Sequence, residues 1–163
     1  MSSDRLRQLE ENLKLLREQQ GGKEKAKILA SLDDQVRIDQ QIREIRKQIR
    51  PYEQEYWQIL TEQSGSVAIA EPEAEVIVAE IVEQTEKLQT SQQYPAEVLD
   101  YLQKIYAEVS KPGTPAAAKL KGAVSLLPPF VSLSYEAEID TENFLRTNFP
   151  TFSKWAKVLA KKS

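Results

Sequence analysis

The clearest pattern in the first third of the chain is a row of apolar residues separated alternately by three and four positions. The longer row consists of Ile38, Ile42, Ile45, Ile49, Tyr52, Tyr56 and Ile59, and a shorter row upstream consists of Leu6, Leu9, Leu13 and Leu16. This spacing places side chains along one side of an α-helix and is typical of a coiled-coil seam. We therefore predict two helices, about 4–30 and 34–62, that fold back as an antiparallel coiled-coil hairpin. The predicted seam contains Leu9, Leu13, Ile42, Ile45, Ile49, Tyr52 and Tyr56.

The segment between the two predicted helices carries the signals of a turn. Ser31 is followed three residues later by Asp34, which resembles a capping box at the start of the second helix. An apolar group surrounds this point and consists of Ala26, Ile28, Leu29 and Leu32. Gly21 and Gly22 are expected to weaken the first helix by about 1 kcal/mol each. Pro51 predicts a kink in the second helix or the start of a new one.

Beyond the hairpin, residues 1–62, the composition changes. Residues 63–75 contain serine, glycine and proline and are predicted to be a linker. The remaining residues, 76–163, are predicted to form a small module. Its first helices are expected at about 72–88, 94–109 and 115–127. The β-branched run Val76–Val78 leaves a strand open as an alternative for the first of them, and Thr114 is the predicted cap of the third.

A second pattern, with a period of two, follows Pro128 and Pro129, which are expected to end the preceding helix. The apolar positions Val131, Leu133, Tyr135, Ala137 and Ile139 alternate with polar ones. Strict alternation is typical of a half-buried strand, so we predict a β-strand at 131–139 with Val131, Leu133, Tyr135 and Ile139 facing inward. Its partner could be 67–69, 76–78 or the same strand of a second chain. The predicted fold is therefore mainly α, with one strand and α+β character near the C-terminus.

The last part of the chain collects aromatic residues, namely Phe144, Phe149, Phe152 and Trp155. Asp140 or Thr141 is expected to cap a helix there, and Pro150 to divide it, with Thr151 as a new cap. Two interpretations are open: the aromatic residues form the core of the module, or part of them forms an exposed docking patch with a basic rim. The candidate partner-binding residues are Phe152, Trp155, Leu159, Lys154 and Lys157.

Composition narrows the functional classes. The chain has no cysteine and no histidine, which excludes disulfides, thiolate catalysis, Cys/His zinc sites and histidine bases. Neither a phosphate-binding P-loop nor a G-x-G-x-x-G motif is present. The carboxylates Glu136, Glu138 and Asp140 could form a site for a hard cation or an acid–base pair, but we interpret them as the solvated face of the predicted strand. We therefore expect a protein that is not an enzyme, with no cofactor and no metal.

Charge and hydropathy bear on location and partners. The net charge is −3, so nucleic acid is not an expected partner. The first residues lack the apolar core of a signal peptide, and no stretch approaches the roughly 18 consecutive apolar residues of a membrane-spanning helix. A cytoplasmic location is expected, and a membrane is not an expected partner.

Two stretches resemble known modules. The segment LRQLEENLKLLREQQGGKEKAKILASLDDQVRIDQQIREIRKQI resembles helical-hairpin modules at the ends of bacterial, especially cyanobacterial, multidomain signalling proteins. The segment KLKGAVSLLPPFVSLSYEAEIDTENFLRTNFPTF is similar to a second module of related proteins. Both look like effector-associated domains, small adaptors beside NACHT-type NTPases, caspase-like proteases or Toll/interleukin-receptor domains. The resemblance covers roughly residues 4–62 and 115–155, and this chain lacks the NTPase and effector parts.

The resemblance and the helical pattern together lead to one functional expectation and one alternative. We expect an adaptor or scaffold that binds a protein partner, either an NTPase or effector with a like module or a second copy of the chain. A heptad seam complements another seam, and flanking charges select the partner. The alternative is a peripheral membrane or nucleic-acid binder that uses the basic aromatic C-terminal tail.

Overall fold

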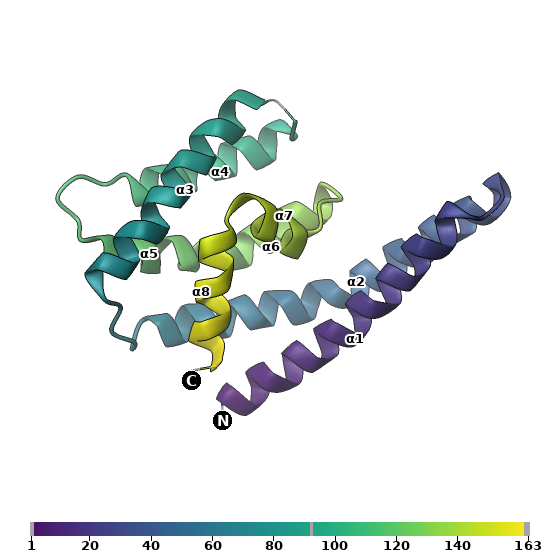
Figure 1. Ribbon diagram of the computed structural model, residues 1–163, viewed down its shortest axis with the longest axis horizontal. Coiled ribbons are helices and arrows are strands. Elements are labelled where there is room, and N and C mark those ends of the chain that lie inside the picture. The colour runs from purple at the N-terminus through teal and green to yellow at the C-terminus, as the bar shows by residue number, and fades with distance from the viewer. Residues whose placement is uncertain (1, 92, 162–163) are drawn as a thin grey trace. The chain divides into compact units, whose positions relative to one another are not determined.

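Helices account for nearly all of the chain in the computed structural model, which describes residues 2–91 and 93–161 (Figure 1). The helices are α1 (Ser2–Ile28), α2 (Leu32–Ser64), α3 (Glu71–Ser91), α4 (Ala96–Val109), α5 (Ala116–Ser125), α6 (Leu127–Glu136), α7 (Thr141–Asn148) and α8 (Pro150–Lys161). Within the described ranges there is no β-strand. The prediction of a mainly α fold is confirmed.

The chain divides into two compact units, Met1–Tyr56 (unit 1) and Trp57–Ser163 (unit 2). Unit 1 contains α1 and most of α2, and unit 2 contains the end of α2 together with α3 to α8. The segment expected as a linker, residues 63–75, holds the last turn of α2, the non-helical residues 65–70 and the start of α3.

In unit 1, side chains of α1 and α2 pair in reverse order along the two helices. Arg5 pairs with Glu55, Arg17 with Glu53, and Lys27 with Asp39, so the partner's number falls as the number on α1 rises. The two helices therefore run antiparallel, as Figure 1 also shows. Large aliphatic residues are buried on both, namely Leu6, Leu9, Leu13, Ile38, Ile45 and Ile49.

Neither the glycine pair nor the proline interrupts its helix. α1 continues through Gly21 and Gly22, and α2 continues through Pro51. Pro51 cannot donate the backbone hydrogen bond of an interior helical residue. Buried side chains lie on both sides of it, including Ile49 and Tyr56. Burial of these residues offsets the hydrogen bond that the proline lacks.

The turn between α1 and α2 is held by local hydrogen bonds. The backbone N–H of Asp34 donates to the Ser31 hydroxyl oxygen over 3.3 Å, so the predicted cap at Ser31 is confirmed. The side-chain amide of Gln35 donates to the carbonyl oxygens of Lys27 (3.3 Å) and Ala30 (3.2 Å). These bonds satisfy backbone groups that the helix ends leave unpaired.

Unit 2 is organised around α3, which packs against α4, α5 and α8. A helix therefore occupies the Val76–Val78 run, and the alternative of a strand there is wrong. Apolar residues of α3 at helical spacing are buried, namely Ala74, Ile77, Val78, Ile81 and Leu88.

Two carboxylates of α3 cap the starts of other helices. Glu71 accepts hydrogen bonds from the backbone N–H groups of Ala116 (2.7 Å) and Ala117 (3.0 Å) at the start of α5. Glu80 accepts from Thr151 (3.1 Å) and Phe152 (3.2 Å) at the start of α8. A carboxylate at a helix N-terminus satisfies unpaired donors and complements the positive end of the helix dipole.

These remote carboxylates correct two predicted caps. Thr114 does not cap α5, because Pro115 occupies the cap position and Glu71 supplies the acceptor. Thr151 does not cap α8, because α8 already begins at Pro150 and the N–H of Thr151 donates to Glu80. Of the two caps predicted for α7, Asp140 and Thr141, Asp140 is the one that accepts from the N–H of Asn143, over 3.2 Å.

The β-strand predicted at 131–139 is wrong, because residues 127–136 form the helix α6. Its buried residues are Leu127, Phe130, Val131 and Ser134, a helical spacing. Of the residues predicted to face inward, Leu133, Tyr135 and Ile139 are only half-buried. Pro128 and Pro129 lie in the first turn of α6, where a missing backbone donor costs nothing, so they begin a helix.

The end of α6 has the hydrogen bonds of a Schellman motif. Glu138 adopts a left-handed conformation with φ of 60°. The N–H of Ile139 donates to the carbonyl of Ser134 over 2.8 Å, and the N–H of Glu138 donates to that of Tyr135 over 3.1 Å. This pattern ends a helix at its C-terminus. Residues 137–139 therefore form the turn after α6, although apolar and polar residues alternate there as they would in a strand.

Candidate functional site

The C-terminal residues predicted to bind a partner form part of the core of unit 2. Phe152, Trp155 and Leu159 are all buried on one side of α8. The Phe152 ring stacks on Trp57 of α2, with centroids 5.9 Å apart and planes 5° apart, and it contacts the Trp155 ring at 5.9 Å. A partner therefore cannot reach these rings while α8 is packed.

The basic part of the predicted patch is separated from its apolar part. Lys154 and Lys157 are exposed on α8, whereas the rings beside them in sequence point into unit 2. An amphipathic docking helix needs its apolar face accessible. Of the two interpretations of the aromatic block, the structure supports core.

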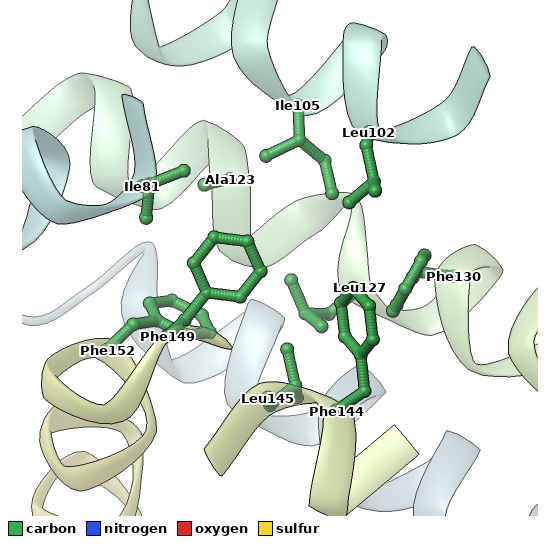
Figure 2. A pocket seen from close by; sticks show the side chains of 10 residues that line it. All are labelled: Ile81, Leu102, Ile105, Ala123, Leu127, Phe130, Phe144, Leu145, Phe149 and Phe152. Carbon is green, nitrogen blue, oxygen red and sulfur yellow. The ribbon is translucent and has the colours of Figure 1, made fainter. Parts of the chain in front are cut away.

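A cavity of about 20 Å³ lies in unit 2 (Figure 2). Its lining consists of Ile81, Leu102, Ile105, Ala123, Leu127, Phe130, Phe144, Leu145, Phe149 and Phe152, all of them apolar. Figure 2 shows rings from α6, α7 and α8 converging on it. A space of about one water volume without polar partners stays dry, so it is a packing defect and not a ligand site.

The predicted seam residues of unit 1 are mostly buried. Leu9 and Leu13 on α1 are buried, as are Ile45, Ile49 and Tyr56 on α2. The other two predicted seam residues, Ile42 and Tyr52, are half-buried. Most of the predicted seam is therefore covered within the chain, and little of it is exposed for a partner.

Polar contacts flank the buried residues of unit 1. Two guanidinium nitrogens of Arg5 donate to the Glu55 carboxylate, at 2.5 and 2.7 Å. This hydrogen bonding lowers the pKa of Glu55 and raises that of Arg5. Glu53 is buried and pairs with Arg17 at 3.5 Å. Both ion pairs join α1 to α2, and the hydrogen bonds between Arg5 and Glu55 are the cause of the two pKa shifts.

In unit 2, burial raises the pKa of Tyr101. Its hydroxyl donates to the carbonyl oxygen of Leu126 over 2.5 Å. The shift and the hydrogen bond keep the phenol neutral and in place between helices, which is a structural role.

The turn between α1 and α2 exposes four large aliphatic side chains. Leu29 is 92% exposed, Leu32 80%, Ile28 77% and Val36 70%. We call these four residues the turn cluster. Exposed aliphatic residues scattered singly are ordinary, but several of them gathered within one short segment indicate an interaction surface.

The sequence contains a signal for this exposure. Residues Leu32 and Val36 do not fit the three-and-four spacing that leads back from Ile38, and Ile28 does not fit the row that leads forward from Leu13. Residues out of register with a buried row point away from the neighbouring helix. The apolar group near the turn already contains Ile28, Leu29 and Leu32, and register with the buried rows is the signal that separates these residues from the core.

Charged residues of both signs lie beside the turn cluster. Lys25 and Lys27 come from α1, and Asp33 and Asp34 from α2. Lys27 pairs with Asp39 at 2.7 Å, and Asp34 pairs with Arg37 at 3.2 Å. The turn is therefore basic on its α1 side and acidic on its α2 side.

An open polar groove of about 500 Å³ lies between α1 and α2. It is lined by Gln19, Lys23, Arg37, Gln40, Gln41, Glu44 and Ile45. Among the residues that the structure describes, no group of three or more acidic side chains lies close enough to hold a metal ion. In the same ranges, no helix is both long and apolar enough to cross a membrane.

Comparison of the chain with family models, with curated proteins and with solved structures gives no match. The resemblance to effector-associated domains therefore stays a prediction.

Proposed function

We propose that the chain is a non-enzymatic adaptor that binds a protein partner through the turn cluster. The observation that carries this proposal is the exposure of Ile28, Leu29, Leu32 and Val36. Leaving four large aliphatic side chains in water is unfavourable, and their burial against a partner recovers about 25 cal/mol for each Å² covered.

In this proposal, residues 1–62 act as an antiparallel coiled-coil hairpin that holds the turn cluster in place. The buried residues Leu9, Leu13, Ile45 and Ile49 support this role, because they fix the two helices against each other. The hydrogen bonds of Ser31 and Gln35 restrict the turn itself. A surface that is ordered before binding loses less conformational entropy when the partner docks.

The resemblance of the sequence supplies the class of partner. An effector or NTPase that carries a like module is the expected partner, and the adaptor would couple such proteins in the cytoplasm. The alternative, a membrane or nucleic-acid binder that uses the C-terminal tail, loses support because Phe152 and Trp155 are buried.

The test compares protein capture by three versions of the tagged full chain after cross-linking in the native cell. The turn variant carries Leu29→Ser and Leu32→Ser. The control carries Val76→Ser and Val158→Ser, which remove exposed aliphatic groups from α3 and α8. We expect the turn variant to lose proteins that the wild type and the control both retain, while all three melt at similar temperatures. Equal capture by all three versions would contradict the proposal.

A further inference from the structure

The turn cluster has opposite charges on its two halves. Lys25 lies three residues before Ile28 on α1, and Asp33 lies three residues before Val36 on α2. Residues three positions apart share a helix face. Lys25 is therefore a cation on the face of the α1 half, and Asp33 is an anion on the face of the α2 half. Glu24 also lies near the α1 half, where its carboxylate accepts a hydrogen bond from Gln20, and Lys23, Lys25 and Lys27 leave this end of α1 net positive.

Neither the charge of Lys25 nor that of Asp33 is neutralised by an ion pair with the residues that the structure describes. The nearby Lys27 and Asp34, by contrast, are paired with Asp39 and Arg37. Lys25 and Asp33 are exposed, and within the described ranges neither side chain takes part in a hydrogen bond or an ion pair. They are available to a partner whose charges are arranged in the opposite order.

We propose that the partner of the turn cluster is a second copy of this chain, docked about a two-fold axis. This inference rests on the proposed function and names the partner of the same surface. The opposite charges select the two-fold axis that runs perpendicular to the plane of α1 and α2, because this axis places the α1 half of each copy on the α2 half of the other. Lys25 of each copy then faces Asp33 of the other, and the aliphatic residues of both copies meet between the charges.

The contact is small, so the association is weak and depends on protein concentration. Stable interfaces bury about 1,200–2,000 Å² in total, and two turns offer less than this range. The aliphatic centre supplies most of the affinity, while the exposed pairs at the rim set the orientation and exclude unsuitable partners.

The same charges also suit the ends of their own helices, since bases favour a C-terminus and acids an N-terminus. The experiment separates the two roles. Sedimentation velocity of the full chain over a concentration series compares the wild type with Lys25→Glu and with Asp33→Lys. Each single variant places like charges opposite each other twice, and we expect each to raise the dimer dissociation constant about tenfold.

An equimolar mixture of the two variants decides the question. In a mixed dimer, the glutamate introduced at position 25 of one chain faces the lysine introduced at position 33 of the other. The second contact joins the unchanged Asp33 and Lys25, so both contacts are again attractive. We expect the mixture to associate nearly as well as the wild type. The helix ends of both variants remain unfavourable in the mixture, so an effect on the helix ends alone would leave the mixture associating as weakly as each single variant and would overturn the proposal.

Two further outcomes distinguish this inference from the proposed function. A wild-type chain that stays monomeric at every concentration, while Leu29→Ser with Leu32→Ser still loses a captured protein, overturns the second copy and leaves the adaptor standing. Flotation with vesicles of phosphatidylcholine and phosphatidylserine that the same variant abolishes, with no self-association, overturns both. In that case the turn cluster binds a lipid surface.

Discussion

The two units of the chain differ in where their most prominent apolar side chains lie. In unit 2, aromatic rings pack in the core, as in the contacts of Phe130 with Tyr101 at 5.8 Å and with Phe144 at 5.3 Å. In unit 1, the buried row on α1 and α2 does not include the turn cluster, which lies in solvent. The aromatic residues near the C-terminus therefore form part of the core of unit 2, whereas the aliphatic residues of the turn cluster are exposed to solvent.

The units also differ in how many helices contribute to their contacts. Unit 1 is held by side chains along two neighbouring helices. Unit 2 is held by residues from distant helices, such as Glu80 and Thr151 or Trp57 and Phe152. Loss of one contact in unit 2 is therefore expected to affect the packing of several helices.

The largest expected effect comes from Trp155→Ala. Removing this buried ring should destabilise unit 2 by about 3–5 kcal/mol, because it leaves a cavity beside Phe152. Denaturant unfolding of the full chain measures it. Leu29→Ala, on the exposed turn, is the control and should change stability by less than about 0.5 kcal/mol. If both changes have similarly small effects, Trp155 is not part of a packed core, and the contrast between the two units is wrong.

The next largest effect distinguishes a helix from a strand at residues 131–136, because the two structures bury different side chains. Ser134 is fully buried, and its hydroxyl contacts that of Thr141. Ser134→Leu should therefore cost about 1–3 kcal/mol through overpacking, with a further cost for the Thr141 hydroxyl. Leu133→Ser, at a half-buried position, should cost less. A strand with Leu133 inward requires the reverse order in the same unfolding measurement.

A smaller effect is expected when α8 loses its cap. Glu80→Ala removes the acceptor for the N–H groups of Thr151 and Phe152 and should destabilise unit 2 by about 1–2 kcal/mol. Glu83→Ala is the matched control on α3. Glu83 pairs with exposed Lys87 at the surface, so its removal should cost less than about 0.5 kcal/mol. Equal costs in denaturant unfolding would mean that the Glu80 contact is not a cap.

The smallest expected effect is on how the stability of unit 1 changes at low pH. Hydrogen bonding from Arg5 lowers the pKa of Glu55 in the folded chain. The resulting stability is present above the unfolded pKa, about 4.3, and is lost as pH falls through the lowered folded value. In unfolding measured against pH, Glu55→Gln should remove this part of the acid sensitivity, whereas exposed Glu18→Gln should not. The difference should shrink with added salt, because the pair is partly exposed.

Much of the helical fold could be predicted from the sequence. The helix expected at 94–109 corresponds to α4, Ala96–Val109, because apolar residues recur along it at helical spacing. The buried face is only partly the expected one: Leu102 and Val109 are buried, but Val98 and Ile105 are buried in place of Leu99 and Tyr106. The turn at Ser31 and the cap at Asp140 could also be predicted, since both depend on residues within one helical turn. Local patterns sufficed where the contacts are local.

The errors arise where one pattern allows two structures or where contacts are distant. The alternation of residues 131–139 favoured a strand because Ser134 counts as polar, yet its buried hydroxyl donates to the carbonyl of Val131 over 2.9 Å. The caps of α5 and α8 come from Glu71 and Glu80, tens of residues upstream. The sequence around the start of α5 or α8 does not indicate which distant carboxylate will cap the helix.

The candidate site shows the same limit. The aromatic residues 144–155 indicated a surface or a core, and only the neighbouring helices, including Trp57 of α2, decide for core. The turn cluster was visible in the sequence as an apolar group, but its exposure follows from which side of each helix faces the other. Register relative to Leu13 and Ile38 could have predicted it.

The two caps supplied by α3 have a consequence for synthesis on the ribosome. Glu71 and Glu80 leave the exit tunnel long before the helices that they cap, α5 and α8. Unit 1 can complete its pairing soon after Glu55 and Tyr56 emerge. In unit 2, the carboxylate of Glu80 has no helix to cap until Pro150 and the residues after it are synthesised, so we expect the nascent chain to expose an incomplete core after all of unit 1 has emerged.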